Sequence, residues 1–161
     1  MKRALMTLLL PVALAACGGA AGGYGGGAAP SSQSGAATIS VQGSSLGQIL
    51  VDGNGKTLYL FEADTSSRST CSGACAQAWP PVTTNGAPNA AGGASASLLG
   101  TTARSDGTTQ VTYSGHPLYS FISDTKPGDT NGEGSTAFGA GWDVLAPTGE
   151  KIEKSASSSS Y

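Results

Sequence analysis

The chain has 161 residues, of which 25 are glycine and only 11% are charged. Average soluble domains have roughly 7% glycine and 25% charge, so this chain is glycine-rich and charge-poor, and its length allows one ordinary domain. A net charge of −2 without a basic patch excludes nucleic acid as a partner. One histidine and three cysteines supply few of the bases and ligands that hydrolytic and metal-dependent sites use.

The N-terminus has the layout of a secretory signal. Lys2 and Arg3 precede an apolar run over residues 4–16, which is well short of the ~20 residues that a membrane-spanning helix needs. The run ends in Leu-Ala-Ala before Cys17, which resembles a bacterial lipobox. We therefore expect residues 1–16 to be a lipoprotein signal peptide and Cys17 to become the lipidated, palmitate-bearing first residue. Loss of Lys2 and Arg3 would change the net charge from −2 to −4.

Lipid on Cys17 would attach the exported protein to a membrane of the cell envelope, because two or three acyl chains together anchor a protein stably. The next residue is glycine rather than an aspartate that would resemble an inner-membrane retention signal. We therefore expect an anchor in the cell membrane or, where the cell has one, in the outer membrane. Whether the domain faces the periplasm or the exterior stays open.

Two low-complexity segments flank the foldable region. Residues 17–37 are mostly glycine, alanine and serine, so they predict a flexible tether behind the lipidated cysteine. Residues 155–161 predict a disordered, Ser-rich tail. The remaining residues, 38–154, are long enough for a modest core and are predicted to form one β domain.

An internal repeat is the strongest organising signal in this region. Residues 51–65 align without a gap on residues 111–125, at an offset of 60. The matching positions are Val51/Val111, Gly55/Gly115, Leu58/Leu118, Tyr59/Tyr119, Phe61/Phe121, Asp64/Asp124 and Thr65/Thr125. We place repeat 1 at about residues 46–82 and repeat 2 at about 106–145.

Each repeat has the pattern of a strand, a Gly-containing turn and a second strand, which predicts a β-hairpin. Only residues 74–78 could form a turn or two of helix, and the Gly-, Ala- and Pro-rich residues 85–96 predict a loop between the repeats. The predicted strands lie at 38–41, 49–51, 57–61, 100–104, 110–113, 117–121, 142–145 and 151–153. The expected fold is all-β and mainly antiparallel: two pseudo-symmetric copies of a β-hairpin-based repeat form one small domain with at most one short helix.

Both repeats contain the pattern Y-x-[FWY]-x-x-D, as Tyr59-Leu-Phe-Glu-Ala-Asp64 and Tyr119-Ser-Phe-Ile-Ser-Asp124. With these motifs the chain resembles the predicted bacterial lipoproteins that carry a Yx(FWY)xxD motif, also described as a secreted repeat of unknown function. The resemblance covers essentially the whole foldable region, including the CSGAC, AWPP and DTKPGDTNG segments. It implies an exported, lipid-anchored repeat protein, and it brings no biochemical activity with it.

Strand alternation places Tyr59 and Phe61 on one face of their strand and Leu58 and Leu60 on the other. We interpret the aromatic side chains as core residues, with each tyrosine hydroxyl bonded near the turn that follows it. Asp64 directly follows its strand, where a carboxylate accepts backbone N–H bonds and closes a turn. Repeat 2 offers the same arrangement with Tyr119, Phe121 and Asp124. The alternative interpretation is an aromatic groove or a redox pair.

Cys71 and Cys75 form a C-x-x-x-C pattern in an exported chain, so we expect them to form a disulfide. A redox dithiol usually has C-x-x-C spacing, and covalent haem attachment requires C-x-x-C-H. A zinc or copper site using both cysteines and His116 would need a further ligand. We interpret His116 as a solvated turn residue, because no nucleophile motif marks it as a catalytic base.

The segment that follows Asp124 alternates oxygen-bearing side chains with glycine, as calcium loops do. Asp129, Asn131 and Glu133 occupy the first, third and fifth positions of such a loop. The twelfth position holds Ala140 instead of a glutamate, so we favour a plain surface loop and keep the three residues as weak metal candidates. No cofactor is assigned.

Two classes of function fit these patterns. The first is a non-enzymatic binding or structural module of the envelope, whose partner is a protein, a polymer or a small ligand. The second is a redox accessory protein, or one that handles a metal or another cofactor, as suggested by the tyrosines, the tryptophans and the cysteine pair. We favour the first class and expect no catalytic residues.

Overall fold

The computed structural model of the protein describes residues 35–152. The predicted signal peptide, Cys17, most of the predicted tether and the Ser-rich tail lie outside the described residues. Ala37, the last residue of the predicted tether, is 1% exposed. Its N–H donates to Thr84 Oγ1 and its carbonyl accepts from Asn89 N–H. The packed and hydrogen-bonded backbone therefore includes Ala37.

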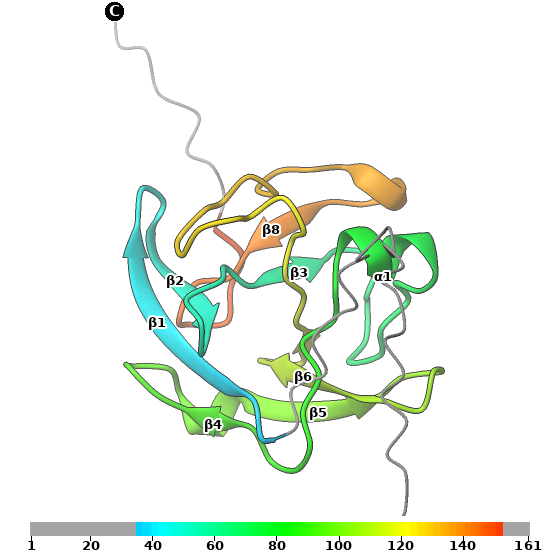
Figure 1. Ribbon diagram of the computed structural model, residues 1–161, viewed down its shortest axis with the longest axis horizontal. Coiled ribbons are helices and arrows are strands. Elements are labelled where there is room, and N and C mark those ends of the chain that lie inside the picture. Colours follow the sequence, from blue (N-terminus) through cyan, green and yellow to red (C-terminus); the bar gives the residue numbers. More distant parts are fainter. Residues whose placement is uncertain (1–34, 153–161) are drawn as a thin grey trace, which may run out of the picture.

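The described chain forms short strands in three small sheets, which confirms the all-β expectation (Figure 1). The first sheet has the order β2-β1-β4, the second β3-β8 and the third β5-β6-β7. All strand pairs are antiparallel except β1 with β4. The strands are β1 (Thr38–Ser44), β2 (Gly47–Asp52), β3 (Tyr59–Phe61), β4 (Asn89–Ala90), β5 (Leu99–Ala103), β6 (Thr109–Tyr113), β7 (His116–Pro117) and β8 (Trp142–Val144).

Helix is confined to short segments. The predicted helix is confirmed as α1 (Ala74–Ala78), which lies on the side of the molecule opposite β1 and β2 (Figure 1). Two 3₁₀ turns cover Ala96–Leu98 and Ala137–Gly139. No helix within residues 35–152 combines the length and the apolar character needed to cross a bilayer.

Two local predictions need correction. Residues 85–96 are not wholly a loop, because Asn89 and Ala90 pair in parallel with Thr38 and Ile39 of β1. Such pairing uses only backbone groups, so composition does not reveal it. The hairpin of repeat 1 is confirmed only beside its turn, where Val51 pairs with Thr57. Beyond the turn β2 pairs with β1, and β3 pairs with β8.

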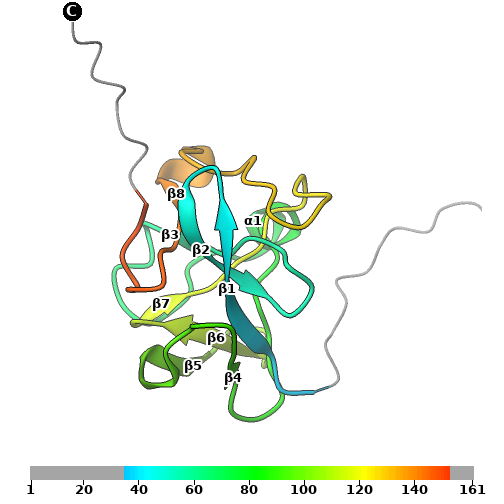
Figure 2. The same ribbon diagram turned by 90° about the vertical axis from the view of Figure 1, so that its left-hand side faces the viewer.

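In repeat 2 the expected hairpin is present, since β6 pairs with β7 across the Ser114-Gly115 turn. β5 precedes this hairpin and adds a third strand to it, because all five residues of β5 pair with β6. Seen from the side, the sheet of β5, β6 and β7 lies below β3 and β8 (Figure 2). Repeat 1 has a corresponding arrangement, in which β1 precedes and pairs with β2.

The two repeats meet at Tyr59 and Tyr119. The N–H of Tyr59 donates to the carbonyl of Tyr119 at 2.9 Å, and the N–H of Tyr119 donates to the carbonyl of Tyr59 at 3.0 Å. Because equivalent residues of the repeats pair with each other, the local pseudo-two-fold axis passes between these two tyrosines. Contacts around this axis come in reciprocal pairs, as at a two-fold subunit interface.

Two buried clusters lie on opposite faces of the central strand β3, which confirms the predicted alternation. Tyr59 and Phe61 belong to one cluster, and Leu58 and Leu60 belong to the other. The aromatic cluster also contains Ile49, Val51, Cys71, Cys75, Trp79, Tyr119, Trp142 and Val144, and the aliphatic cluster contains Ala37, Ile39, Leu50, Val111, Tyr113, Leu118 and Leu145.

Gly132 allows the chain to pass close to the aromatic cluster. A Cβ at this position would lie 2.6 Å from Trp79 Cη2 and 3.1 Å from Tyr59 Cε1. We expect Gly132→Ala to lower the free energy of unfolding by about 1–3 kcal/mol, because a packed interior does not absorb an added methyl group. Urea denaturation measures the change. Gly43→Ala is the matched control, since a Cβ there meets nothing within 4 Å; an equal loss in both variants would contradict the contact.

Candidate functional site

The motif tyrosines and aspartates form two crossed hydrogen bonds between the repeats. The hydroxyl of Tyr59 donates to Asp124 Oδ2 at 2.6 Å, and the hydroxyl of Tyr119 donates to Asp64 Oδ2 at 2.6 Å. All four residues are buried: the tyrosines are 0% exposed, Asp124 is 1% exposed and Asp64 is 5% exposed. Each repeat therefore supplies the hydrogen-bond acceptor for the tyrosine of the other.

The crossed hydrogen bonds differ from the prediction for the tyrosines and agree with the prediction for the aspartates. The sequence predicts that each tyrosine hydroxyl bonds near the turn that follows it. The acceptor instead comes from the opposite repeat, because the pseudo-two-fold axis brings the two motifs face to face. The aspartates do close turns, as expected. Asp64 Oδ1 accepts from the N–H and the hydroxyl of Thr70, and Asp124 Oδ1 accepts from the N–H of Asn131.

The motif phenylalanines join a continuous stack of four rings. The indoles of Trp79 and Trp142 stack with centroids 3.9 Å apart and planes 5° apart. Phe61 stacks on Trp142 at 4.1 Å, and Phe121 stacks on Trp79 at 4.2 Å. Each phenylalanine thus packs on the tryptophan of the other repeat. Tyr59 and Tyr119 add edge-to-face contacts to Trp79 and Trp142, respectively, each with centroids 5.2 Å apart.

Burial raises the pKa of Tyr59 and of Tyr119 well above the usual 10.0, and the hydrogen bonds to Asp124 and Asp64 raise it further. The fold therefore keeps both phenols protonated where an unfolded chain would ionise them. Because the unfolded state then binds fewer protons, stability is fully present below pH 10 and is lost as the pH rises above it.

This linkage predicts that Tyr59 and Tyr119 form no tyrosinate while the protein is folded at pH 10 to 11. The tyrosinate absorbance and the circular dichroism of the full chain should be followed together during alkaline titration. We expect part of the absorbance change to coincide with unfolding, whereas in denaturant all tyrosines should titrate near 10. Complete ionisation of the folded protein before any loss of circular dichroism would contradict the burial.

Arg104 is a buried residue that the sequence patterns did not single out. Its side chain is 3% exposed and connects the loop of repeat 1 to the strands of repeat 2. Its guanidinium donates to Ser69 Oγ (2.6 Å), Gln110 Oε1 (2.7 Å), the Cys71 carbonyl (2.8 Å) and Asp106 Oδ2 (3.1 Å). An arginine just before an Asp-Gly turn is typical of an exposed strand end. Its equivalent in repeat 1 at the offset of 60 is Ser44, so the repeat alignment also offers no signal.

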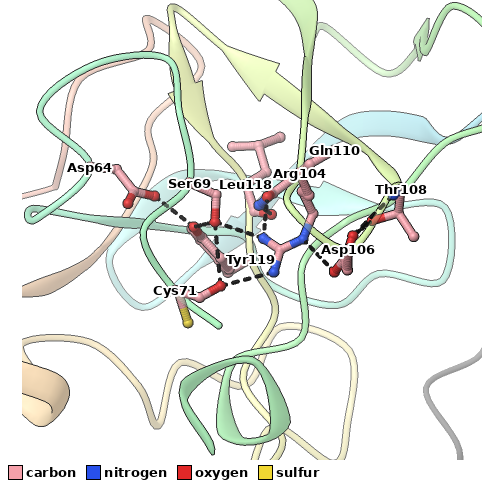
Figure 3. Close-up of polar contacts among 9 residues, drawn as sticks. All are labelled: Asp64, Ser69, Cys71, Arg104, Asp106, Thr108, Gln110, Leu118 and Tyr119. Carbon is pink, nitrogen blue, oxygen red and sulfur yellow. Dashed lines mark hydrogen bonds and ion pairs between the residues drawn. The ribbon is translucent and has the colours of Figure 1, made fainter. Parts of the chain in front are cut away.

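The Arg104 network extends to one of the crossed pairs (Figure 3). Ser69 Oγ is hydrogen-bonded to Tyr119 Oη at 2.7 Å, so Asp64, Tyr119, Ser69 and Arg104 are connected in series. Gln110 continues the series by donating through Nε2 to the Leu118 carbonyl at 2.7 Å. A shared network of this kind makes the positions of these polar groups mutually dependent.

The predicted disulfide between Cys71 and Cys75 is confirmed, with a Cα–Cα distance of 5.3 Å. The backbone carbonyls of its two cysteines accept hydrogen bonds from different parts of the structure. The carbonyl of Cys71 accepts from Arg104, and the carbonyl of Cys75 accepts from the N–H of Trp79 at 2.8 Å. Because the loop that it closes is short, the chain-entropy model gives the disulfide a stabilising effect of only about 2 kcal/mol.

The weak metal candidates of repeat 2 are hydrogen-bonded to backbone groups of their own loop and of β8. Asp129 Oδ2 accepts from the N–H groups of Thr125 and Lys126, and Glu133 Oε2 accepts from the N–H of Val144. Asn131 Nδ2 donates to the carbonyl of Ser123. Among residues 35–152 no three histidine, cysteine, aspartate or glutamate side chains gather where they could hold a metal ion. The structure therefore does not bring these candidates together as a ligand set.

His116 lies beside a shallow surface depression of about 230 Å³ between the loop of repeat 1 and the β6–β7 turn. The imidazole is half-buried, and its side chain makes no hydrogen bond within the described part of the chain. The depression is lined by Asp64, Thr65, Ser66, Ser67, Ser114, Gly115 and His116. Apart from Asp64 and His116, these residues did not stand out as site candidates. One difference between the repeats could have drawn attention to this depression: Ser66 and Ser67 align with Lys126 and Pro127 of repeat 2.

The comparison with known families agrees with this repeat architecture. A family model described as a secreted repeat of unknown function matches residues 40–83 and 100–146, which together make up more than half of the chain. The chain therefore belongs to this family of secreted repeat proteins, and membership implies export. No curated protein and no solved structure gives a significant match.

Proposed function

We propose that the protein is a lipid-anchored, non-enzymatic binding module of the bacterial cell envelope. In this proposal Cys17 carries the lipid, the following Gly-, Ala- and Ser-rich residues act as a tether, and the β domain presents a ligand-binding surface. The anchor lies in the outer membrane where the cell has one. The partner is an envelope protein, polymer or small ligand.

The observation that carries this proposal is the burial of the motif that the two repeats share. Tyr59, Tyr119, Asp64 and Asp124 are all at most 5% exposed, and their polar atoms are hydrogen-bonded to one another, to backbone groups and to the hydroxyls of Ser69 and Thr70. A catalytic group must reach its substrate within hydrogen-bond distance. The motif residues instead clamp the two repeats together, which leaves recognition to the loops on the surface.

The tether supports a presenting role. A Gly-rich chain of roughly twenty residues has an average end-to-end distance of about 25 Å. A domain attached in this way can reach partners near the membrane without being fixed against it. Two or three acyl chains on Cys17 would make the attachment stable.

Metabolic labelling tests the anchor. Cells that express the full chain are grown with an alkyne-tagged palmitate, and the protein is then coupled to a fluorophore and separated by detergent phase partitioning. We expect label and detergent-phase recovery for the native chain and neither for Cys17→Ser. An unlabelled native chain in the aqueous phase would overturn the anchoring proposal.

A second candidate is a redox accessory protein or one that handles a metal or another cofactor. The stacked indoles of Trp79 and Trp142 and the two tyrosine–carboxylate hydrogen bonds favour it, because aromatic rings in contact and hydrogen-bonded phenols are suited to electron and proton movement. This candidate requires a bound group that the non-enzymatic module does not need.

A thermal melt of the mature full-length protein in detergent separates the two candidates. The panel contains calcium, zinc, copper, haem and flavin. A ligand at 100 times its Kd adds about 2.7 kcal/mol of stability, which corresponds to roughly 10 °C or more in Tm for a domain of this size. We expect no such shift. One shift of that size, or colour in the purified protein, would replace the binding-module proposal by the second candidate.

A further inference from the structure

The pseudo-two-fold symmetry predicts two equivalent junctions between a motif loop and the turn of the other repeat. In one junction the loop after Asp124 faces Gly55, where an added Cβ would lie 3.0 Å from Pro127 Cβ. In the other junction the loop after Asp64 faces Gly115, where an added Cβ would lie 3.4 Å from Ser67 Oγ. The two junctions therefore have the same arrangement, in which the motif loop of one repeat lies against the turn of the other.

One of the two junctions is closed by hydrogen bonds. The N–H of Gly128 donates to the carbonyl of Gly55 at 3.0 Å, and Thr57 Oγ1 donates to the carbonyl of Asp129 at 2.6 Å. These bonds hold the loop of repeat 2 directly against the turn of repeat 1.

The other junction is open for reasons that lie in the sequence. The loop after Asp64 is one residue shorter, since Asp64 closes on Thr70 six residues later whereas Asp124 closes on Asn131 seven residues later. The equivalent of Thr57 is Pro117, which has no hydroxyl to donate. Among the described residues no hydrogen bond joins residues 65–67 to the 114–116 turn, and the surface depression lies between them.

The depression offers neutral hydrogen-bonding groups. Thr65, Ser66, Ser67 and Ser114 bring hydroxyls, which both donate and accept, and His116 brings an imidazole. The carboxylate of Asp64 is already occupied on both oxygens, by Thr70 and by Tyr119.

The chemistry of the lining disfavours anionic, cationic and apolar ligands. An anion would find no lysine or arginine in the lining, and a cation would find no free carboxylate. The large exposed hydrophobic residues of the described chain, Ile122 and Phe138, lie outside the lining, so an apolar ligand is not favoured. The volume of about 230 Å³ is smaller than the ~300 Å³ at which pockets for drug-sized ligands begin.

We propose that this depression binds one neutral sugar unit of an envelope glycan. A sugar ring presents several hydroxyls that pair with hydroxyl and imidazole groups, and an open depression lets the rest of a polymer extend into solvent. The inference rests on the proposed function as a binding module and names its site and its ligand class. Because the site uses few hydrogen bonds on an open surface, we expect weak binding with a Kd on the order of 1 mM.

The test is a titration of the isotope-labelled, mature full-length protein in detergent, followed by the NMR shifts of its backbone amides. The probes are the tetramers of N-acetylglucosamine and of glucose, with inorganic phosphate as an anionic probe. We expect at least one tetramer to give saturable shifts confined to residues 65–67 and 114–116. His116→Ala should weaken binding roughly fivefold, as expected for one lost hydrogen bond.

Lys56→Ala is the matched control, because Lys56 is the aligned residue at the closed junction. It should leave the affinity unchanged. The inference is overturned if neither tetramer shifts these amides, if phosphate alone does, or if Lys56→Ala weakens binding as much as His116→Ala. Palmitate labelling is independent of these outcomes, so a failed sugar titration with a labelled chain rejects the ligand and leaves the anchor standing.

Discussion

Trp142→Ala is expected to lower the free energy of unfolding by about 3–5 kcal/mol. Trp142 is 0% exposed, stacks between Phe61 and Trp79, and donates from Nε1 to the Ala137 carbonyl at 2.8 Å. Removal of the indole leaves a cavity at the centre of the four-ring stack and an unpaired carbonyl. Since small domains are stable by only about 5–15 kcal/mol in total, much of the stability would be lost.

Urea denaturation followed by far-UV circular dichroism measures this effect. Trp142→Phe is the graded control: it keeps a ring in the stack and loses only the hydrogen bond and part of the area, so it should cost less than the alanine variant. If Trp142→Ala does not fold, the phenylalanine variant still reports on the stack. A loss below about 1 kcal/mol in the alanine variant, as at an ordinary surface position, would show that the stack does not hold the repeats together.

The crossed pairing should be visible as energetic coupling between the repeats. We expect Asp124→Asn to cost about 1–3 kcal/mol, because it removes the charge that accepts from Tyr59 and from the N–H of Asn131. In a double-mutant cycle with Tyr59→Phe, the coupling energy should be about 1–3 kcal/mol, since the two residues share a hydrogen bond of 2.6 Å.

The control cycle combines Tyr59→Phe with Asp64→Asn, which belong to the same sequence motif but share no hydrogen bond. Its coupling energy should be within about 0.5 kcal/mol of zero, as for independent sites. All variants are compared by urea denaturation of the full chain. Coupling within one motif and none across the repeats would contradict the crossed arrangement.

Local patterns predicted the local parts of the fold. Alternation along residues 58–61 correctly separated Tyr59 and Phe61 from Leu58 and Leu60, because side-chain direction in a strand depends only on the strand itself. The short helix at 74–78 and the disulfide that follows from the spacing of Cys71 and Cys75 were equally local.

Long-range choices were outside the reach of these patterns. Composition predicts a loop where β4 forms, because the partner of β4, strand β1, lies about fifty residues earlier in the chain. Local patterns do not single out Arg104, because its partners, the half-buried Ser69 and the buried Cys71, are 35 and 33 residues away. A charged residue is buried only where it is paired, and the residues next to Arg104 in the sequence do not reveal these distant partners.

The sequence by itself determined the duplication, the β class and the residues that form the core, since these depend on repeat spacing, strand alternation and hydrophobicity. Only the tertiary structure decided how the copies are combined. The pseudo-two-fold axis between Tyr59 and Tyr119 pairs each tyrosine with the aspartate of the other repeat. The same axis also explains why one junction is closed and the other is open. Each motif loop faces the turn of the other repeat, so the one-residue difference in loop length changes the contacts at that junction.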